Sequence, residues 1–178
     1  MRILLILFLF LSSFCLQAQS DAERYLSRFD SLAMEVSGKY EIPASVVLGI
    51  ALLESAAGTS RLCRINHNHF GMKVRVKSSK TRSGYTTTFR KFESDEAAYL
   101  YFGEMVSGKK YYSGLKGNTD YLTWLKAMKA AKYATTSSWV IHVDKMIKRY
   151  DLTCYDKTVP DKAMYLTAET DTIPFQKK

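Results

Sequence analysis

The chain has 178 residues, enough for one domain with a substantial core but not comfortably for two. It carries 26 basic and 17 acidic residues, a formal net charge of +9. Such an excess favours solubility, or attraction to an anionic surface such as a cell-wall polymer, a membrane face or nucleic acid. Because the basic residues are dispersed and match no nucleic-acid-binding motif, nucleic acid is the partner that the sequence argues against.

The N-terminal residues have the pattern of a secretory signal. Arg2 is followed by an unbroken apolar run from Ile3 to Leu11 and then by small and polar residues. We predict a signal peptide over residues 1–18, and therefore an exported protein that is periplasmic or secreted. The run is too short to span a membrane. A lipid anchor on Cys15 is the alternative, but bulky Phe14 precedes it where such sites want a small residue.

Removal of this signal would leave two cysteines, Cys63 and Cys154. In an oxidising compartment one disulfide between them is the simple expectation. Two buried free thiols are the alternative, because the sequence does not supply the geometry of a pair.

Two helices are predicted first. Ser20 to Tyr40 forms an amphipathic helix, because it opens with a capping box and its apolar residues recur at three- and four-residue spacing. Ser45 to Gly58 is apolar or small at every position except Glu54. A helix that is apolar all round is surrounded by protein, and this one is too short to span a bilayer. We therefore predict that it is the core helix of the domain.

Glu54 is the anomaly in the last turn of this core helix. Burial raises the pKa of a carboxyl group because it disfavours the charged form, and a general acid that works near neutral pH needs such a shift. Glu54 is therefore a candidate catalytic acid. The alternative is that it emerges into solvent at the helix end, or caps a neighbouring backbone N–H.

The segment from Arg61 to Lys73 has too many turn formers for a regular helix, and it carries His67 and His69. A histidine pair without further ligands is a weak metal signal, because zinc sites need three or four converging ligands. We expect no metal and no cofactor.

The next segment, Val74 to Phe92, has a central turn signal and strand-like alternation. This pattern predicts a β-hairpin, or a small two- or three-stranded sheet. No Asp or Glu occurs between Glu54 and Glu93, so the hairpin has no acidic side chain.

Three more helices are predicted to follow, at about residues 94–107, 119–131 and 137–150, from their caps and apolar spacing. From residue 155 on periodicity is lost, so we predict a loosely ordered tail over residues 155–178. The domain itself is expected over residues 19–154, without an internal repeat or a second domain.

Four short motifs occur in order along this domain: Ala51-Leu-Leu-Glu-Ser55 with Gly58-Thr-Ser60, Asn68-His-Phe-Gly-Met-Lys73, Phe89-Arg-Lys-Phe-Glu-Ser94 and Ala131-Lys-Tyr-Ala-Thr135. Their order and spacing resemble the glucosaminidase family of peptidoglycan hydrolases, family 73 of the glycoside hydrolases, over about residues 38–152. The resemblance implies a mainly α (α+β), lysozyme-like fold, with a helical body and a small β-hairpin lobe flanking a groove. It also implies hydrolysis of the β-1,4 bond after N-acetylglucosamine in the glycan strand.

Through this resemblance Glu54 matches the catalytic acid of the family. Tyr133 matches a tyrosine that faces the catalytic groove, although it could instead be a packing ring between two helices. Phe70 and Gly71 match a groove-floor motif, in which Gly71 would supply a backbone conformation that other residues dislike. Lys132 stands where the family usually has glycine, which puts the local backbone in question.

Further aromatic residues are candidates for stacking on sugar rings, although aromatic residues also belong to cores: Tyr85, Tyr111, Tyr112 and Trp139. The second catalytic group is open. Some family members are thought to use an acid of the β-lobe to activate water, and this hairpin offers none. Either Glu93 swings toward the groove, or the 2-acetamido group of the substrate acts as the internal nucleophile, which we favour.

Two other functions stay open. The chain could be a non-catalytic glycan-binding module that uses the same groove. It could also be a peptidoglycan amidase, which would need zinc ligands that the sequence does not supply, or a free Cys63 paired with a histidine. In each case we expect a monomer that binds the peptidoglycan glycan strand, with no nucleic-acid partner and no membrane span.

Overall fold

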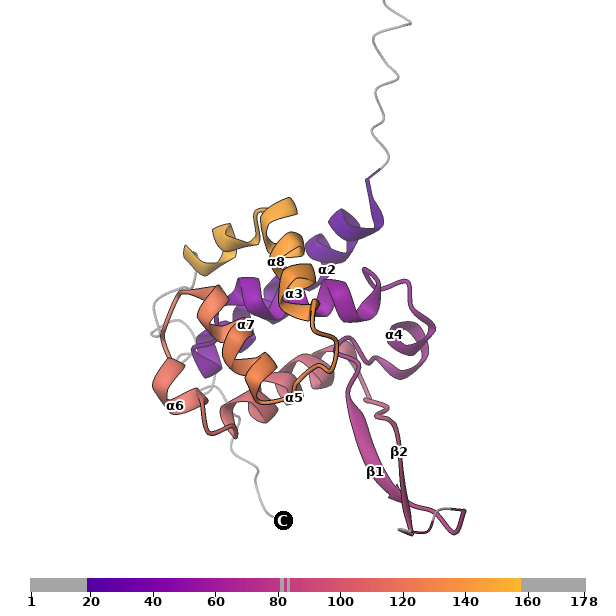
Figure 1. Ribbon diagram of the computed structural model, residues 1–178. Coiled ribbons are helices and arrows are strands. Elements are labelled where there is room, and N and C mark those ends of the chain that lie inside the picture. The colour runs from indigo at the N-terminus through magenta and orange to yellow at the C-terminus, as the bar shows by residue number, and fades with distance from the viewer. Residues whose placement is uncertain (1–18, 81, 83, 158–178) are drawn as a thin grey trace, which may run out of the picture.

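The computed structural model describes residues 19–157 with the exception of residues 81 and 83. The predicted signal peptide, and residues 158–178 of the predicted tail, lie outside this range. Helices form one body, and a two-stranded hairpin extends away from it (Figure 1). In chain order the elements are α2 (Asp21–Tyr40), α3 (Ala44–Ser55), α4 (Arg61–Asn66), β1 (Lys73–Lys77), β2 (Tyr85–Phe89), α5 (Asp95–Ser107), α6 (Tyr112–Leu115), α7 (Tyr121–Ala130), α8 (Trp139–Arg149) and the 3-10 helix η1 (Leu152–Lys157).

The centre of the body is α3. Every side chain from Ala44 to Leu52 is buried, as the all-round apolar pattern predicts. Helices α2, α7 and α8 and the 3-10 helix η1 pack around it. Where α8 crosses, a Cβ at Gly49 would lie 2.7 Å from a side-chain carbon of Ile147, so the two helices touch closely. Because it is enclosed in this way, α3 is a rigid support for the residues at its end.

The C-terminal end of α3 differs from the prediction. The helix ends at Ser55 rather than near Gly58, because Ala56 adopts a left-handed conformation with φ of 51°. Glu54 is therefore the second-last residue of the helix. The chain leaves the helix axis immediately after Ser55, at the left-handed residue Ala56.

The N-terminal end of α3 is capped from the far end of the domain. The residue at the cap position, Pro43, offers no side-chain acceptor. Instead Asp156 Oδ1 accepts a hydrogen bond of 2.8 Å from the N–H of Ser45. The boundary between domain and tail was predicted after residue 154, but η1 continues to Lys157 and its Asp156 caps the core helix.

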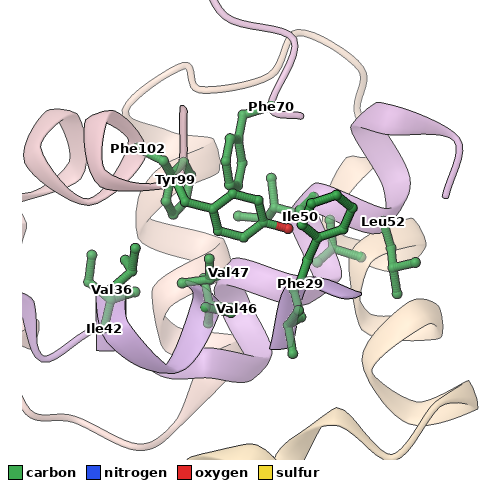
Figure 2. Close-up of a cluster of buried hydrophobic side chains, with 14 of the residues drawn as sticks. Phe29, Val36, Ile42, Val46, Val47, Ile50, Leu52, Phe70, Tyr99 and Phe102 are labelled. Atoms are coloured by element: carbon green, nitrogen blue, oxygen red, sulfur yellow. The ribbon is translucent and has the colours of Figure 1, made fainter. Parts of the chain in front are cut away.

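A layer of aromatic rings lies between α3 and α5. Phe70 stacks on Phe102 with ring centroids 4.3 Å apart, and Tyr99 meets Phe70 edge-on at 5.0 Å (Figure 2). All three rings are buried. The loop that carries Phe70 is therefore fastened to the core, and so is the glycine that follows it.

Strands β1 and β2 pair antiparallel in the register Lys73↔Phe89 to Lys77↔Tyr85. In β1 exposed and half-buried residues alternate, whereas every residue of β2 is exposed. The hairpin thus confirms the prediction of a small β-lobe, and it contributes little to the core.

The sequence prediction was wrong about short helices and about the disulfide. Helix α4 occupies a segment that was expected to be irregular, because Ser60 caps it through a hydrogen bond from the N–H of Cys63. The predicted disulfide is wrong, since Cys63 and Cys154 are both free. Cys63 is buried beside His69, whereas Cys154 is exposed on η1. No helix within the described part of the chain is long and apolar enough to cross a membrane.

Candidate active site

Glu54 is held by a tryptophan of the last helix of the body. The indole N–H of Trp139 donates to Glu54 Oε1 over 2.9 Å. Trp139 opens α8, and its ring is only 4 % exposed. The Glu54 side chain is half-buried, so it is neither enclosed in the core nor free in solvent. The packing of α8 against α3 therefore fixes the orientation of this carboxyl group.

The second oxygen of Glu54 faces Gly71. A Cβ at Gly71 would lie 3.1 Å from Glu54 Oε2, closer than ordinary van der Waals contact. Gly71 has a φ of +63°, a left-handed conformation that glycine adopts without strain, as expected. Glycine thus leaves open the space in front of Oε2.

Asn68 braces the loop that carries Gly71. Its side chain is fully buried, accepts from the N–H of Met72 over 2.9 Å and donates to the carbonyls of Met72 and Arg90 over 2.8 Å each. This bracing ties the loop to the base of the hairpin. Asn68 was part of a motif in the sequence, but nothing in the sequence alone indicated which groups it would join.

The proton of a neutral Glu54 can be assigned from this geometry. An indole N–H can only donate, so Oε1 acts as an acceptor. A carboxylic acid has one proton, and the oxygen left to carry it is Oε2. The proton would therefore lie on the side of Gly71, which has no side chain to cover it.

Tyr133 lies next to this pair. Its ring centroid is 5.2 Å from that of Trp139, and its hydroxyl donates to the carbonyl of Phe70 over 3.3 Å. Burial, and next the negative charge of Glu54, raise the pKa of Tyr133, so the hydroxyl stays protonated. Tyr133 therefore joins the turn after α7 to the loop that carries Gly71.

Lys129 shapes the turn in which Tyr133 lies. Its ammonium group donates to the carbonyls of Ala134, Thr135 and Thr136 over 2.7–2.9 Å. Lys132 adopts a left-handed φ of 61°. No periodicity or motif pointed to Lys129.

The other predicted site residues are dispersed. Phe70 and Trp139 are buried, so they support the site and offer no open ring face. Tyr111 is half-buried and lines a hollow together with Tyr133. Tyr85 is exposed on the hairpin, with the guanidinium of Arg75 lying 4.1 Å from its ring centroid.

Glu93, the candidate second carboxylate, is exposed in the link between β2 and α5. Within the described part of the chain, Glu93 forms no hydrogen bond with the residues around Glu54. Tyr112, a further candidate ring, donates from its hydroxyl to the carbonyl of Tyr40 over 2.8 Å.

The two histidines of the 61–73 segment meet on one carboxylate. His67 Nδ1 and His69 Nε2 lie 2.7 and 2.9 Å from Asp95 Oδ1. Burial lowers the pKa of His69, against the opposing effect of Asp95, so His69 is neutral near pH 7. Burial alone would raise the pKa of Asp95, but the bonds from His69 and His67 outweigh it and hold that pKa below its usual value.

Cys63 completes this cluster. Its sulfur lies 3.4 Å from His69 Nδ1, and the hydroxyl oxygen of Tyr25 lies 2.7 Å from the same nitrogen. Burial, and next the charge of Asp95, raise the pKa of Cys63 to about 11. The thiol is therefore protonated and is packed as part of the core.

These elements define a class of protein. A helical body with a two-stranded lobe, and a carboxylic acid at the end of the central helix, form a lysozyme-like fold of the kind found in glycoside hydrolases. The catalytic domain of the autolysin Auto from Listeria monocytogenes has a similar structure. Its TM-score is 0.61 at 24 % sequence identity, over 82 % of this chain and 93 % of that domain.

The sequence comparison then gives the family. The model of the family described as mannosyl-glycoprotein endo-beta-N-acetylglucosaminidase, the glucosaminidase family, matches residues 30–152. The chain belongs to this family, which confirms the resemblance found in its motifs.

Two curated relatives are similar in sequence. The exo-glucosaminidase LytG of Bacillus subtilis is 29 % identical over 138 residues, 68 % of this chain and 49 % of LytG. An autolysin of Enterococcus faecalis is 29 % identical over 160 residues, 78 % of this chain and 21 % of that protein. The chain therefore spans about half of the first relative and a fifth of the second.

Proposed function

We propose that this protein hydrolyses the β-1,4 bond after N-acetylglucosamine in peptidoglycan glycan strands, with Glu54 as the general acid. Membership of the glucosaminidase family, and relatives named as a glucosaminidase and an autolysin, support this substrate and reaction. The observation that carries the role of Glu54 is the different surroundings of its two carboxyl oxygens. Trp139 holds one carboxyl oxygen, and the other faces the space left by Gly71.

The first step uses the proton on Glu54 Oε2. As the bond between the sugar C1 and the glycosidic oxygen breaks, this proton moves to the departing oxygen. Glu54 is then a carboxylate, and the indole N–H of Trp139 at 2.9 Å stabilises its negative charge. Because α8 already holds Glu54 in place, its carboxyl group need not reorient when the proton moves, and this orientation lowers the activation barrier.

The second group at C1 is the acetamido oxygen of the substrate. It attacks C1 as the leaving oxygen departs, and water then opens the cyclic intermediate while the Glu54 carboxylate takes the proton of that water. This choice is supported by the lack of any Asp or Glu between Glu54 and Glu93. In the rival mechanism Glu93 activates water directly, which would require it to approach the sugar from its exposed position.

Sugar-binding roles follow from position. Tyr133 and Tyr111 share a hollow, and Tyr133 contacts Trp139, which holds Glu54, so both tyrosines would contact sugars on that side. Tyr85 would contact the strand from the hairpin, whereas the buried Phe70 and Trp139 act by supporting the site. We further propose that the protein acts as a monomer outside the cytoplasm, in the periplasm or after secretion, in line with its predicted signal peptide and with wall-directed relatives.

Mass spectrometry of digested peptidoglycan tests the reaction. The proposal predicts products that end in reducing N-acetylglucosamine. Products that end in N-acetylmuramic acid would identify a different bond, and released stem peptides would identify an amidase. Absence of products, with binding to the polymer retained, would identify a non-catalytic glycan-binding module.

A Glu93→Gln variant tests the mechanism. The substrate-assisted route predicts near-normal rates and products that first appear with retained anomeric configuration. A loss as complete as that of Glu54→Gln, together with inverted products from the unmodified protein, would make Glu93 the base that activates water.

One contact in the structure favours the amidase alternative, and the burial and pKa of Cys63 and the lack of a zinc site among the described residues argue against it. Cys63 is free and lies beside His69, and a hollow of about 510 Å³ borders both residues. However, the sulfur-bearing residue is only 5 % exposed, and its pKa is raised to about 11, so a thiolate is disfavoured. A zinc amidase would need three or four converging ligands, and residues 19–157, apart from 81 and 83, hold no group of three or more His, Cys, Asp or Glu side chains placed to bind a metal ion, the cluster around Asp95 included.

A further inference from the structure

A positively charged hollow lies beside the candidate active site. It has a volume of about 210 Å³ and is bounded by the base of the hairpin, the end of α5 and the turn after α7. Among the residues that the structure describes, its lining includes three lysines and three tyrosines but no Asp or Glu: Lys73, Lys109, Lys132, Tyr101, Tyr111 and Tyr133. Glu54 does not line the hollow, but Tyr133 links the two, because its ring contacts Trp139, which holds Glu54.

The three lysines bring positive charge to one place without a counter-charge. Lys73, Lys109 and Lys132 are exposed, and none of them forms an ion pair with a carboxylate in the described part of the chain. Ion pairs between a lysine and a carboxylate in the described part of the chain are those of Lys116 with Glu41 and Lys148 with Asp144. Most exposed lysines are therefore unpaired, and the distinguishing feature of the three is that they line one hollow. Like charges around one hollow repel one another, and an anion bound among them would relieve this repulsion.

Lys132 occupies its place at a cost. Its φ of 61° is a conformation that glycine adopts without strain and lysine does not. Packing does not explain the choice, because the side chain is exposed. The left-handed conformation belongs to the end of α7, where the N–H of Tyr133 donates to the carbonyl of Met128, and Glu41 and Ala56 adopt it at the ends of α2 and α3. What Lys132 adds to this turn is an exposed positive charge at the rim of the hollow.

The hairpin extends this positive charge away from the body (Figure 1). Lys73, Arg75 and Lys77 alternate along β1 and therefore share one face of the hairpin, the exposed one. On that face the ammonium group of Lys73 lies 5.4 Å from the ring centroid of Phe89, which is 46 % exposed. The face combines cations with aromatic rings from the hollow to the tip of the hairpin.

We propose that Lys73, Lys109 and Lys132 form a carboxylate-binding subsite that selects glycan strands carrying acidic substituents over neutral N-acetylglucosamine polymers. The inference rests on the proposed function and names what that function would select. In peptidoglycan the carboxylate has two sources: the stem peptide, or the lactyl group of a muramic acid whose peptide has been removed. A bound carboxylate beside Tyr133 would fix the register of the strand at Glu54.

The variant Lys132→Gly tests this with little risk to folding, because it removes the charge and the backbone strain together. It is combined with Lys73→Gln and Lys109→Gln in a triple variant. The matched control, which also removes three charges, combines Lys39→Gln, Lys126→Gln and Lys145→Gln, since these residues are exposed on α2, α7 and α8 and none lines the hollow. Melting temperatures establish that all variants fold.

Each protein is assayed for kcat/KM on intact peptidoglycan, on peptide-free glycan strands and on a neutral chito-oligosaccharide. The proposal predicts that the triple variant loses about tenfold or more on an anionic substrate, as expected for three ion pairs at a partly exposed site, and stays within about twofold on the neutral one. Loss on intact peptidoglycan alone identifies the stem peptide as the ligand. Loss on peptide-free strands identifies the lactyl carboxylate.

Two outcomes would overturn the subsite: equal losses on the neutral and the anionic substrates, or no loss on any substrate. Failure of the proposed function gives a separate result, since the unmodified protein would then cleave none of the three. In that event co-sedimentation with the same polymers still decides, in a Glu54→Gln background and over a range of salt concentrations. Weaker, less salt-dependent binding of the triple variant to the anionic polymers supports the subsite, and unchanged binding refutes it.

Discussion

Replacing Gly71 by alanine adds one methyl group directly in front of the candidate catalytic carboxyl group. The added Cβ would lie 3.1 Å from Glu54 Oε2, so the carboxyl group must shift by a few tenths of an ångström. It would also fill the space through which a glycosidic oxygen must reach the proton on that oxygen. Catalysis depends on such positioning, and a misplacement of about 1 Å can cost about 100-fold in rate.

The same change has a separate effect on stability. At φ of +63° alanine is strained, which costs about 1 kcal/mol relative to glycine. For a domain of this size, 1 kcal/mol corresponds to a fall of about 3 °C in melting temperature. Most molecules therefore remain folded at room temperature, and a large loss of activity would not reflect unfolding.

Gly84→Ala is the matched control. Gly84 has nearly the same φ, +68°, but a Cβ there would meet no atom within 4 Å. Both variants should lose a similar amount of melting temperature, whereas only Gly71→Ala should lose most of its rate of wall hydrolysis, measured as release of reducing ends. If the two variants hydrolyse the wall at equal rates, the space in front of Oε2 is not where the substrate reacts.

Three further predictions follow from contacts in the body. Trp139→Phe removes the N–H that donates to Glu54 at 2.9 Å. Because a hydrogen bond to a charged group contributes about 2 kcal/mol, kcat/KM should fall about 30-fold. An unchanged kcat/KM would show that this bond does not orient the acid. Because burial lowers the pKa of His69 in the folded state, the unfolded chain binds more protons below about pH 6.5. Calorimetry should therefore show that stability falls as the pH drops from 7 to 5, and that it falls less steeply in His69→Phe. Equal slopes of stability against pH in the two proteins would contradict this. Gly103→Ala places a Cβ against the ring of Tyr40 with no room for it, so the melting temperature should fall by several degrees or more, whereas Gly114→Ala, which meets nothing within 4 Å, should change it little.

Features that depend on local pattern were predictable from the sequence. The all-round apolar run identified α3 as the core helix, and it is buried from Ala44 to Leu52. Capping and periodicity located α5, which runs from Asp95 to Ser107, close to the expected residues 94–107. The order of motifs indicated the glucosaminidase family, and the family comparison confirmed it.

Features that depend on tertiary packing were not predictable. The bond from Trp139 to Glu54 joins residues 85 positions apart, and no sequence pattern encodes it. The disulfide prediction failed because cysteine count carries no geometry, and Cys63 packs against His69 instead. Helix α6 was missed because it is only four residues long, too short for a periodic pattern.

The rate of Glu54→Gln tests the central claim most directly. Glutamine keeps the size of the side chain and can still accept from the Trp139 N–H, but it has no acidic proton to give to the glycosidic oxygen. Measured as reducing-end formation on purified peptidoglycan, its rate should fall by about 10²- to 10⁴-fold at an unchanged melting temperature, while Glu104→Gln, an exposed change on α5, stays at the level of the unmodified protein. A Glu54→Gln rate within a few-fold of the unmodified protein would contradict the assignment of Glu54 as the proton donor.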